Sequence, residues 1–272
     1  MTRSSGRAVR SARQVALLAL LTLLAFVAAA CGSSAPGLTD PKEILSKGIA
    51  GLANLKSFHV DVALAGSVSL NLSNPTAGGG TPFPLDGSTI TADVDVAGKK
   101  IAASLVVTMF KADLLMTGDA VYVKAPLLGA TKWMKSSGGN SVTSVVTNPA
   151  QVISAMKRFL AQPGIAPAKQ PNDKVGDQDC YKVTFTVPAS MVTGALAAAG
   201  SAAPALPSGL TLGDVPVSAW VTTSDQRLTK LALDLPLGSA GTISMTITLS
   251  KFDVPVTVSP PPADQIQTTG SG

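Results

Sequence analysis

The sequence predicts an α+β protein built on a strongly curved antiparallel half-barrel sheet with helices on its concave face. Long runs alternate apolar and polar residues, short Gly- and Pro-rich segments separate these runs, and few helix signals interrupt them. Because strands joined by short turns pair in antiparallel fashion, we expect a meander whose helices pack on the apolar face of the sheet.

The amino-terminal segment predicts export from the cytoplasm. It carries Arg3, Arg7, Arg10 and Arg13 without an acidic residue, and an apolar run follows over residues 15–30. The run is about 16 residues long, shorter than the roughly 20 that a permanent membrane helix needs. We therefore interpret residues 1–30 as a signal peptide.

Cys31 is the predicted site of lipidation. The small residues Ala28-Ala29-Ala30 precede it, in a pattern that resembles the bacterial lipoprotein signal, although leucine is more usual at the position of Ala28. Two or three acyl chains on Cys31 would anchor the protein stably at the extracytoplasmic face of the cell membrane, with residues 31–39 as a flexible tether. An ordinary secretory signal cut after Ala-x-Ala, or an uncleaved anchor, is the alternative.

The charge of the mature chain excludes a strongly basic binding surface. The whole chain has 21 basic and 16 acidic residues, and four of the basic residues belong to the signal peptide, which leaves 17 against 16. The pI of about 9.3 therefore reflects the export signal, and no nucleic-acid partner is expected.

The second cysteine, Cys180, is expected to be a free thiol, half-buried at the start of a strand. The chain has two cysteines, and lipid on Cys31 would leave Cys180 without a partner in the chain. A disulfide between Cys31 and Cys180 is the competing interpretation, since the exported chain enters an oxidising compartment.

Three helices are expected in the mature chain. Asp40-Pro41 and Asn148-Pro149 each pair a capping residue with proline at the first helical position, which predicts helices over 41–55 and 149–160. A weaker helix signal begins near residue 188 and fades toward residue 200.

The strands should form one domain over residues 40–258, followed by a disordered tail over 259–272. The alternating runs cover 59–72, 90–96, 101–109, 183–187, 215–221, 231–235 and 243–249. The first run would span roughly 45 Å if straight, far more than a usual strand, so we expect it to bend at Gly66. The Gly- and Pro-rich segment over 74–87 is expected to be a loop.

The apolar face of this sheet predicts an elongated cavity sized for acyl chains. Its residues are small aliphatic ones, aromatic residues make up 4% of the chain, and three short helices offer little cover. A fully packed core without a cavity is the alternative that the pattern leaves open. The predicted lining residues are Val62, Leu64, Leu105, Val107, Met109, Ile243, Met245 and Ile247.

Several segments resemble the LppX/LprA/LprF/LprG family of actinobacterial lipoproteins. They are residues 55–60 (Leu-Lys-Ser-Phe-His-Val), 118–124, 215–221, 225–228 and 252–258. The resemblance implies a half-barrel sheet with helices on its concave side, enclosing a pocket for multi-acylated lipids or lipoglycans that are carried toward the outer envelope. The insertions over 74–87 and 195–209 depart from the family pattern and could reshape the mouth of the cavity.

Motifs for catalysis, metals and cofactors are missing from the sequence. The one histidine, His59, lies on the polar side of a strand, and no nucleophile elbow, phosphate loop or Cys/His metal spacing is present. Asp173, Asp177 and Asp179 lack the glycine and the distal glutamate of a calcium loop, which favours a solvated turn. We expect no catalytic residues, no metal and no cofactor.

The sequence thus predicts a non-enzymatic, membrane-anchored lipoprotein that binds acylated lipid or lipoglycan in a hydrophobic cavity and carries it across the cell envelope. A membrane exporter is a candidate partner. The main alternative is a surface scaffold without a cavity, which docks envelope or exporter proteins, and a hydrolase is a third reading.

Overall fold

The structure of the chain is a computed structural model. The structure describes residues 37–70, 80–108, 110–118, 120–126, 129–137, 149–199 and 211–267. The compact unit treated below is Leu38–Gly272, and the predictions about the signal peptide, Cys31 and Met109 lie outside the described residues. No helix in the described ranges has the length and apolar character needed to cross a membrane.

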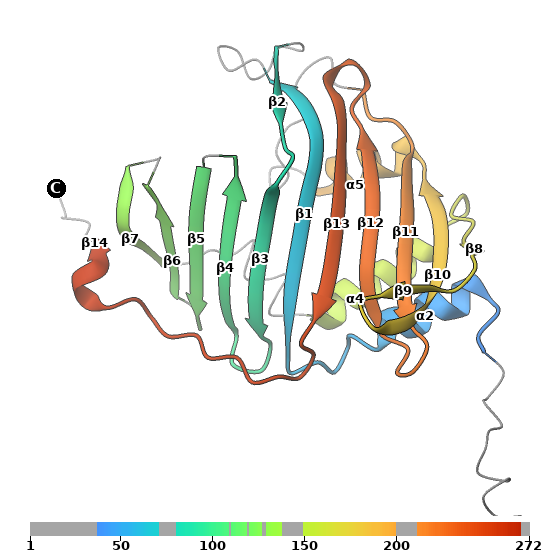
Figure 1. Cartoon of the computed structure of the whole chain (residues 1–272), viewed down its shortest axis with the longest axis horizontal. Coiled ribbons are helices and arrows are strands. Elements are labelled where there is room, and N and C mark those ends of the chain that lie inside the picture. Colours follow the sequence, from blue (N-terminus) through green and yellow to red (C-terminus); the bar gives the residue numbers. More distant parts are fainter. Residues whose placement is uncertain are drawn as a thin grey trace, which may run out of the picture. The chain divides into compact units, whose positions relative to one another are not determined.

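One sheet holds the strands of the described residues (Figure 1). The strands are β1 Ser57–Leu70, β2 Thr81–Pro84, β3 Ser88–Asp95, β4 Lys100–Val107, β5 Phe110–Thr117, β6 Ala120–Ala125, β7 Ala130–Ser137, β8 Ala168–Lys169, β9 Asp173–Val175, β10 Gln178–Val187, β11 Val215–Thr222, β12 Leu228–Pro236, β13 Gly241–Ser250 and β14 Ile266–Gln267. Their order is β14-β7-β6-β5-β4-β3-β1-β13-β12-β11-β10-β8, with β2 added to β1 and β9 added to β10.

Two meanders meet in the middle of the sheet. Strands β3 to β7 extend from one edge of β1, and strands β10 to β12 extend from the far edge of β13. β1 and β13 pair in antiparallel fashion from His59 opposite Ser250 to Val68 opposite Gly241. The predicted meander is therefore confirmed within each half. The two halves are joined by the pairing of β1 with β13, which are far apart in the sequence.

Gly66 marks a change of partner along β1. Leu64 is the last residue opposite β3, and Ser67 is the first residue opposite β2. Gly66 has a φ of +92°, and its carbonyl oxygen accepts a hydrogen bond from the Leu85 N–H at 2.8 Å. The segment over 74–87, expected to be a loop, therefore contains a short strand over 81–84 that extends the sheet beside β1.

The helices are α2 Pro41–Ala50, α4 Pro149–Leu160 and α5 Ala189–Ala199, and two 3₁₀ turns, η3 Gly238–Ala240 and η4 Ala263–Gln265, lie near β13 and β14. α2 begins as predicted, because the Asp40 carboxylate accepts a hydrogen bond from the Lys42 N–H at 2.8 Å. It ends at Ala50 rather than near residue 55. Leu52 N and Ala53 N donate to carbonyls three residues earlier, which replaces the helix by tight turns.

The helices cover the half of the sheet that contains β10 to β12. Ile44 and Leu45 of α2 pack in one buried cluster with Val183, Ala219 and Val221. Figure 1 shows α2, α4 and α5 behind the right-hand half of the sheet. A separate cluster on β3 to β5 receives no helical residue within the described ranges, so the described helices cover one half of the sheet.

The carboxyl-terminal segment differs from the disordered tail expected over 259–272. After β13 the chain runs along the strand ends to the opposite edge of the sheet (Figure 1), where β14 pairs in parallel with β7. Ile266 lies opposite Trp133, and the Lys132 ammonium donates to the Asp264 carbonyl at 3.0 Å. Backbone partners on the edge strand thus order residues up to 267, while residues 268–272 lie outside the described residues.

Candidate functional site

A hydrophobic pocket lies between α2, α4 and the strands beneath them. Its volume is about 160 Å³. The lining side chains, all of them apolar, are Leu45 and Ile49 of α2, Met156, Phe159 and Leu160 of α4, Phe185 and Val187 of β10, Val217 and Ala219 of β11, and Leu228 and Leu231 of β12. Because these residues offer water no hydrogen-bonding side chain, the pocket favours an apolar guest.

The size of the pocket limits what it can hold. An apolar protein cavity of roughly 150 Å³ stays dry and accepts a benzene-sized guest. The pocket therefore suits a short stretch of methylene groups, and it is smaller than the roughly 300 Å³ at which sites for whole small molecules begin. A longer apolar ligand would extend along the adjoining face of the sheet.

The register of the sheet shows which residues share a face with the pocket. Directly opposite residues point to the same face, and Leu231 of the pocket lies opposite Ile247, which lies opposite Val62. The same row continues through Ile90 to Leu105 on β4. An apolar row therefore crosses five strands, from the pocket under the helices to the half of the sheet on which none of the described helices packs.

The described members of the predicted lining lie on this face, but none of them lines the pocket. Leu64 and Met245 are opposite each other one row away, and Val107 follows Leu105 by two positions. They are half-buried on β1, β4 and β13, whereas the pocket lies under β10 to β12. These residues thus form an apolar face beside the pocket, which consists of Val62, Leu64, Leu105, Val107, Ile243, Met245 and Ile247 and is called the open apolar face below.

Sequence reasoning missed the pocket residues for a specific reason. The apolar alternation over 215–221 and 231–235 placed positions such as Ala219 and Leu231 on the apolar face of the sheet. Nothing in those patterns showed which strands lie beneath which helices. The contact of α2 with β10, β11 and β12 decides this, and it joins residues more than 100 positions apart.

His59 lies on the opposite, polar face between two carboxylates. Its Nδ1 is 2.6 Å from Asp93 Oδ1, and its Nε2 is 3.2 Å from Asp61 Oδ2. Ser250 is opposite His59 in the register, yet both ring nitrogens face carboxylates, so no serine–histidine pair of the kind used in nucleophilic catalysis is formed there.

Asp173 also has a structural partner. The Trp220 indole N–H donates to Asp173 Oδ2 at 3.0 Å, and this hydrogen bond holds the pKa of the Asp173 carboxyl below its ordinary value. Asp179 lies 3.6 Å from the Lys174 ammonium. The described residues contain no group of carboxylates, cysteines and histidine that could hold a metal ion.

Cys180 is a free cysteine on β10 and is fully buried, not half-buried as expected. Its Sγ lies 3.6 Å from the Gln178 carbonyl oxygen, and burial raises the pKa of the thiol above its ordinary value. A raised pKa lowers the fraction of reactive thiolate at any given pH.

We predict that Cys180 resists thiol reagents in the native protein at pH 8 and reacts promptly once the chain is unfolded. Burial blocks access, and the raised pKa keeps the thiol protonated. An absorbance assay with an aromatic disulfide measures both rates on the same sample. Prompt reaction of the native protein would contradict a closed core at β10, and no reaction of the unreduced, unfolded chain would instead reveal a disulfide.

Comparison with known proteins identifies the fold. No protein-family model matches the chain, and no curated protein matches it. Among solved structures, LprF from Mycobacterium bovis is similar with a TM-score of 0.52 and 20% identity, over 81% of this chain and 96% of that one. The lipoprotein LppX from Mycobacterium tuberculosis has 22% identity over 80% of this chain and 97% of that one, with a TM-score of 0.49.

The chain therefore has the fold of LprF, a protein of the family that its sequence segments resemble. The resemblance implied a half-barrel sheet with helices on its concave side, and the structure shows one large sheet whose strand pairs are antiparallel except for β14 with β7.

Proposed function

We propose, on the premise of the LprF fold, that this chain is a non-enzymatic, membrane-anchored lipoprotein that binds acylated lipid or lipoglycan and carries it across the cell envelope. The observation that supports the proposal most is the wholly apolar pocket under α2 and α4. In this proposal Cys31 carries the lipid anchor at the extracytoplasmic face of the cell membrane, and a membrane exporter delivers or receives the lipid.

The driving force for binding is desolvation of the acyl chain. Each buried methylene contributes about 0.8 kcal/mol, so a chain of about 16 methylenes gains on the order of 10 kcal/mol before the cost of ordering it. The pocket accommodates only part of such a chain. The remainder is proposed to lie on the open apolar face, whose residues are half-buried and need cover.

The lining of the pocket also indicates which end of the lipid enters. No charged or hydrogen-bonding side chain lines it, so a headgroup placed there would lose its hydration without compensation. The methyl end of an acyl chain is therefore proposed to enter between α2 and α4, and the headgroup remains outside. Selection would act on chain length and bulk, with little selection among headgroups by the pocket itself.

We predict that the protein purified from a bacterial host carries a bound acylated lipid. Native mass spectrometry should show an added mass that is lost after unfolding, and the released molecule should fragment as an acyl lipid. The lipid covalently held at Cys31 stays with the unfolded chain, which separates anchor from cargo. Absence of any releasable lipid, together with no uptake of a fluorescent fatty acid by the stripped protein, would contradict the proposal.

A further inference from the structure

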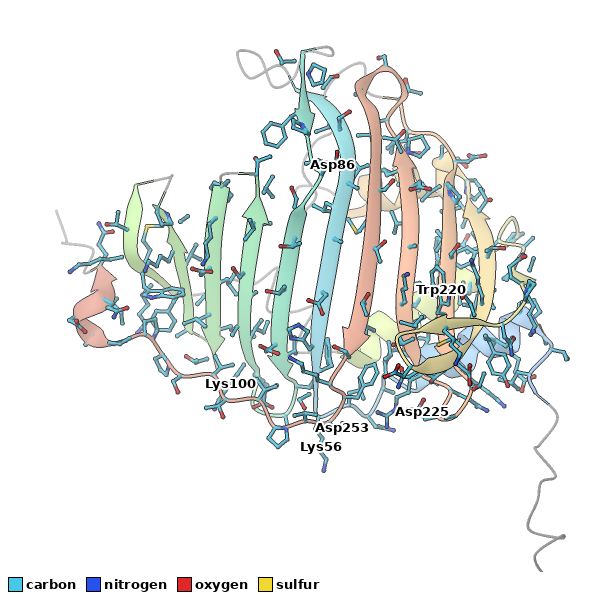
Figure 2. All side chains as sticks on the ribbon, in the orientation of Figure 1. Lys56, Asp86, Lys100, Trp220, Asp225 and Asp253 are labelled. Atoms are coloured by element: carbon cyan, nitrogen blue, oxygen red, sulfur yellow. The ribbon has the colours of Figure 1, made fainter. Side chains whose placement is uncertain are left out.

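Four lysines gather where the ends of β13, β1, β3 and β4 meet. Lys56 precedes β1, Lys251 follows β13, Lys100 begins β4, and Lys99 lies in the turn before it. The Val96 N–H donates to the Lys56 carbonyl, which brings the turn against the start of β1. Figure 2 shows Lys56 and Lys100 along the lower end of the sheet, and we call Lys56, Lys99, Lys100 and Lys251 the lysine rim.

The charge of the lysine rim is not neutralised by the carboxylates around it. Asp253 and Asp225 both pair with Arg227 at 3.3 Å, and Asp95 accepts the Gly98 N–H at 2.8 Å. Among the described residues, no ion pair includes a lysine of the rim. The carboxylates beside the rim thus already have partners, including Asp93, which lines a pocket with Lys251 and pairs with His59.

The backbone at two of these lysines is unusual. Lys99 has a φ of +51° and Lys251 a φ of +49°, the left-handed region that glycine or asparagine adopts more readily. Both lysines are exposed. The turns thus carry long cationic side chains at positions where the backbone alone favours a smaller residue.

The opposite end of the strands carries exposed carboxylates. Asp86, Asp214 and Asp234 are exposed at that end, and Figure 2 shows Asp86 near its top. Asp86 accepts from Gly66 N and Asp234 lies opposite Ser244, which places both beside the far end of β1 and β13. Lys111, Lys124 and Lys132 lie toward this same end on β5, β6 and β7, so this end holds charges of both signs.

The chain enters the domain at the same end as the lysine rim. The Leu38 N–H donates to the Tyr181 hydroxyl at 3.2 Å, near the start of β10, and Gly51 lies against Gln226 and Arg227 in the β11–β12 turn. Seven residue steps separate Leu38 from the predicted lipidation site Cys31, a reach of at most about 25 Å. A membrane that held Cys31 would therefore lie close to this end.

We propose that the lysine rim rests on the anionic phosphate headgroups of the membrane, so that the strands stand away from the bilayer. The inference rests on the lipid anchor of the proposed function. Lysine is a hydrated point charge that suits a plane of headgroups, and its attraction is effective only within a Debye length, about 8 Å at physiological salt. In this orientation, the end of the open apolar face formed by Val62 and Ile247 is the end nearer the bilayer, from which acyl chains would come.

The test uses the full chain reconstituted into vesicles of phosphatidylcholine, with or without phosphatidylglycerol. A water-soluble amine-acylating reagent labels the lysines, and peptide mass spectrometry gives the rate at each one. We expect labelling of the rim lysines to slow at least about fivefold with phosphatidylglycerol, and high salt to reverse this protection. Lys111 and Lys124, which lie away from the rim, should label equally in both vesicles.

Two charge-matched variants test the role of the rim. The triple variant Lys99→Gln, Lys100→Gln, Lys251→Gln should abolish the protection of Lys56, whereas Lys111→Gln, Lys124→Gln, Lys157→Gln should leave it unchanged. Equal labelling of the rim lysines in both vesicle types would overturn the inference. Equal loss of the protection of Lys56 in both triple variants would overturn it too. Vesicle flotation reports separately on the lipid anchor. If the chains float with the vesicles but their rim lysines are labelled at the same rate in both vesicle types, only the inference about the lysine rim is contradicted. If the chains float with neither vesicle type, the lipid anchor is contradicted as well.

Discussion

Leu231→Trp is expected to weaken acyl-lipid binding by at least about tenfold while the protein stays folded. Leu231 lines the pocket and is half-buried, so the larger indole can occupy the free volume between β12 and the helices. Excluding about two methylenes of the ligand from the pocket costs roughly 1.6 kcal/mol, which corresponds to a factor of about ten or more in Kd. Titration of the stripped variant with a fluorescent fatty acid measures this loss.

Ala232→Trp is the matched control, because the neighbouring residue points to the other face of the same strand. Ala232 lies opposite Thr246 and Ser218, and it does not line the pocket. We expect its affinity for the fatty acid to equal that of the unmodified protein. If both variants bound normally, the pocket would not be the binding site. If both lost binding along with thermal stability, the effect would come from disturbed folding instead.

Gly66→Ala is expected to cost roughly 3 kcal/mol of the free energy of unfolding. The φ of +92° at Gly66 is one that residues with a Cβ rarely adopt. A Cβ added there would also lie 2.3 Å from the Thr242 carbonyl oxygen, and a backbone atom in a paired strand cannot rotate away. The substitution therefore forces β1 and β13 apart at the seam between the two meanders. Urea denaturation followed by tryptophan fluorescence measures the change.

Gly87→Ala separates the cost of the positive φ from the cost of the close contact with the neighbouring strand. Gly87 has a φ of +77°, yet a Cβ at this position would meet no atom within 4 Å. Only the conformational penalty applies, so we expect a loss of about 1 kcal/mol. Equal losses for Gly66→Ala and Gly87→Ala would show that the close approach of β1 to β13 contributes nothing to stability.

Local features of the structure could be predicted from the residues nearby. The Asp40 cap and Pro149 start their helices as expected, because a capping hydrogen bond and a fixed proline φ act within one turn. The alternation along β1 correctly separated Val62 and Leu64 from Asp61, since side chains on a strand alternate between two faces. The length of α2 was overestimated, because its apolar spacing continues to Leu52 after the backbone has left the helix.

The sequence by itself determined the kind of elements, the face that each residue takes, and the apolar character of any site that the elements could form. The tertiary structure alone decided that β1 pairs with β13 and that the pocket lies under β10 to β12 instead of under the predicted lining residues. The physical reason is that alternation of apolar and polar residues along a strand specifies which face of the sheet each side chain takes, and does not specify which strand lies beside it. The partner depends on close approach between distant segments, such as α2 at Gly48, where an added Cβ would lie 2.5 Å from Val221.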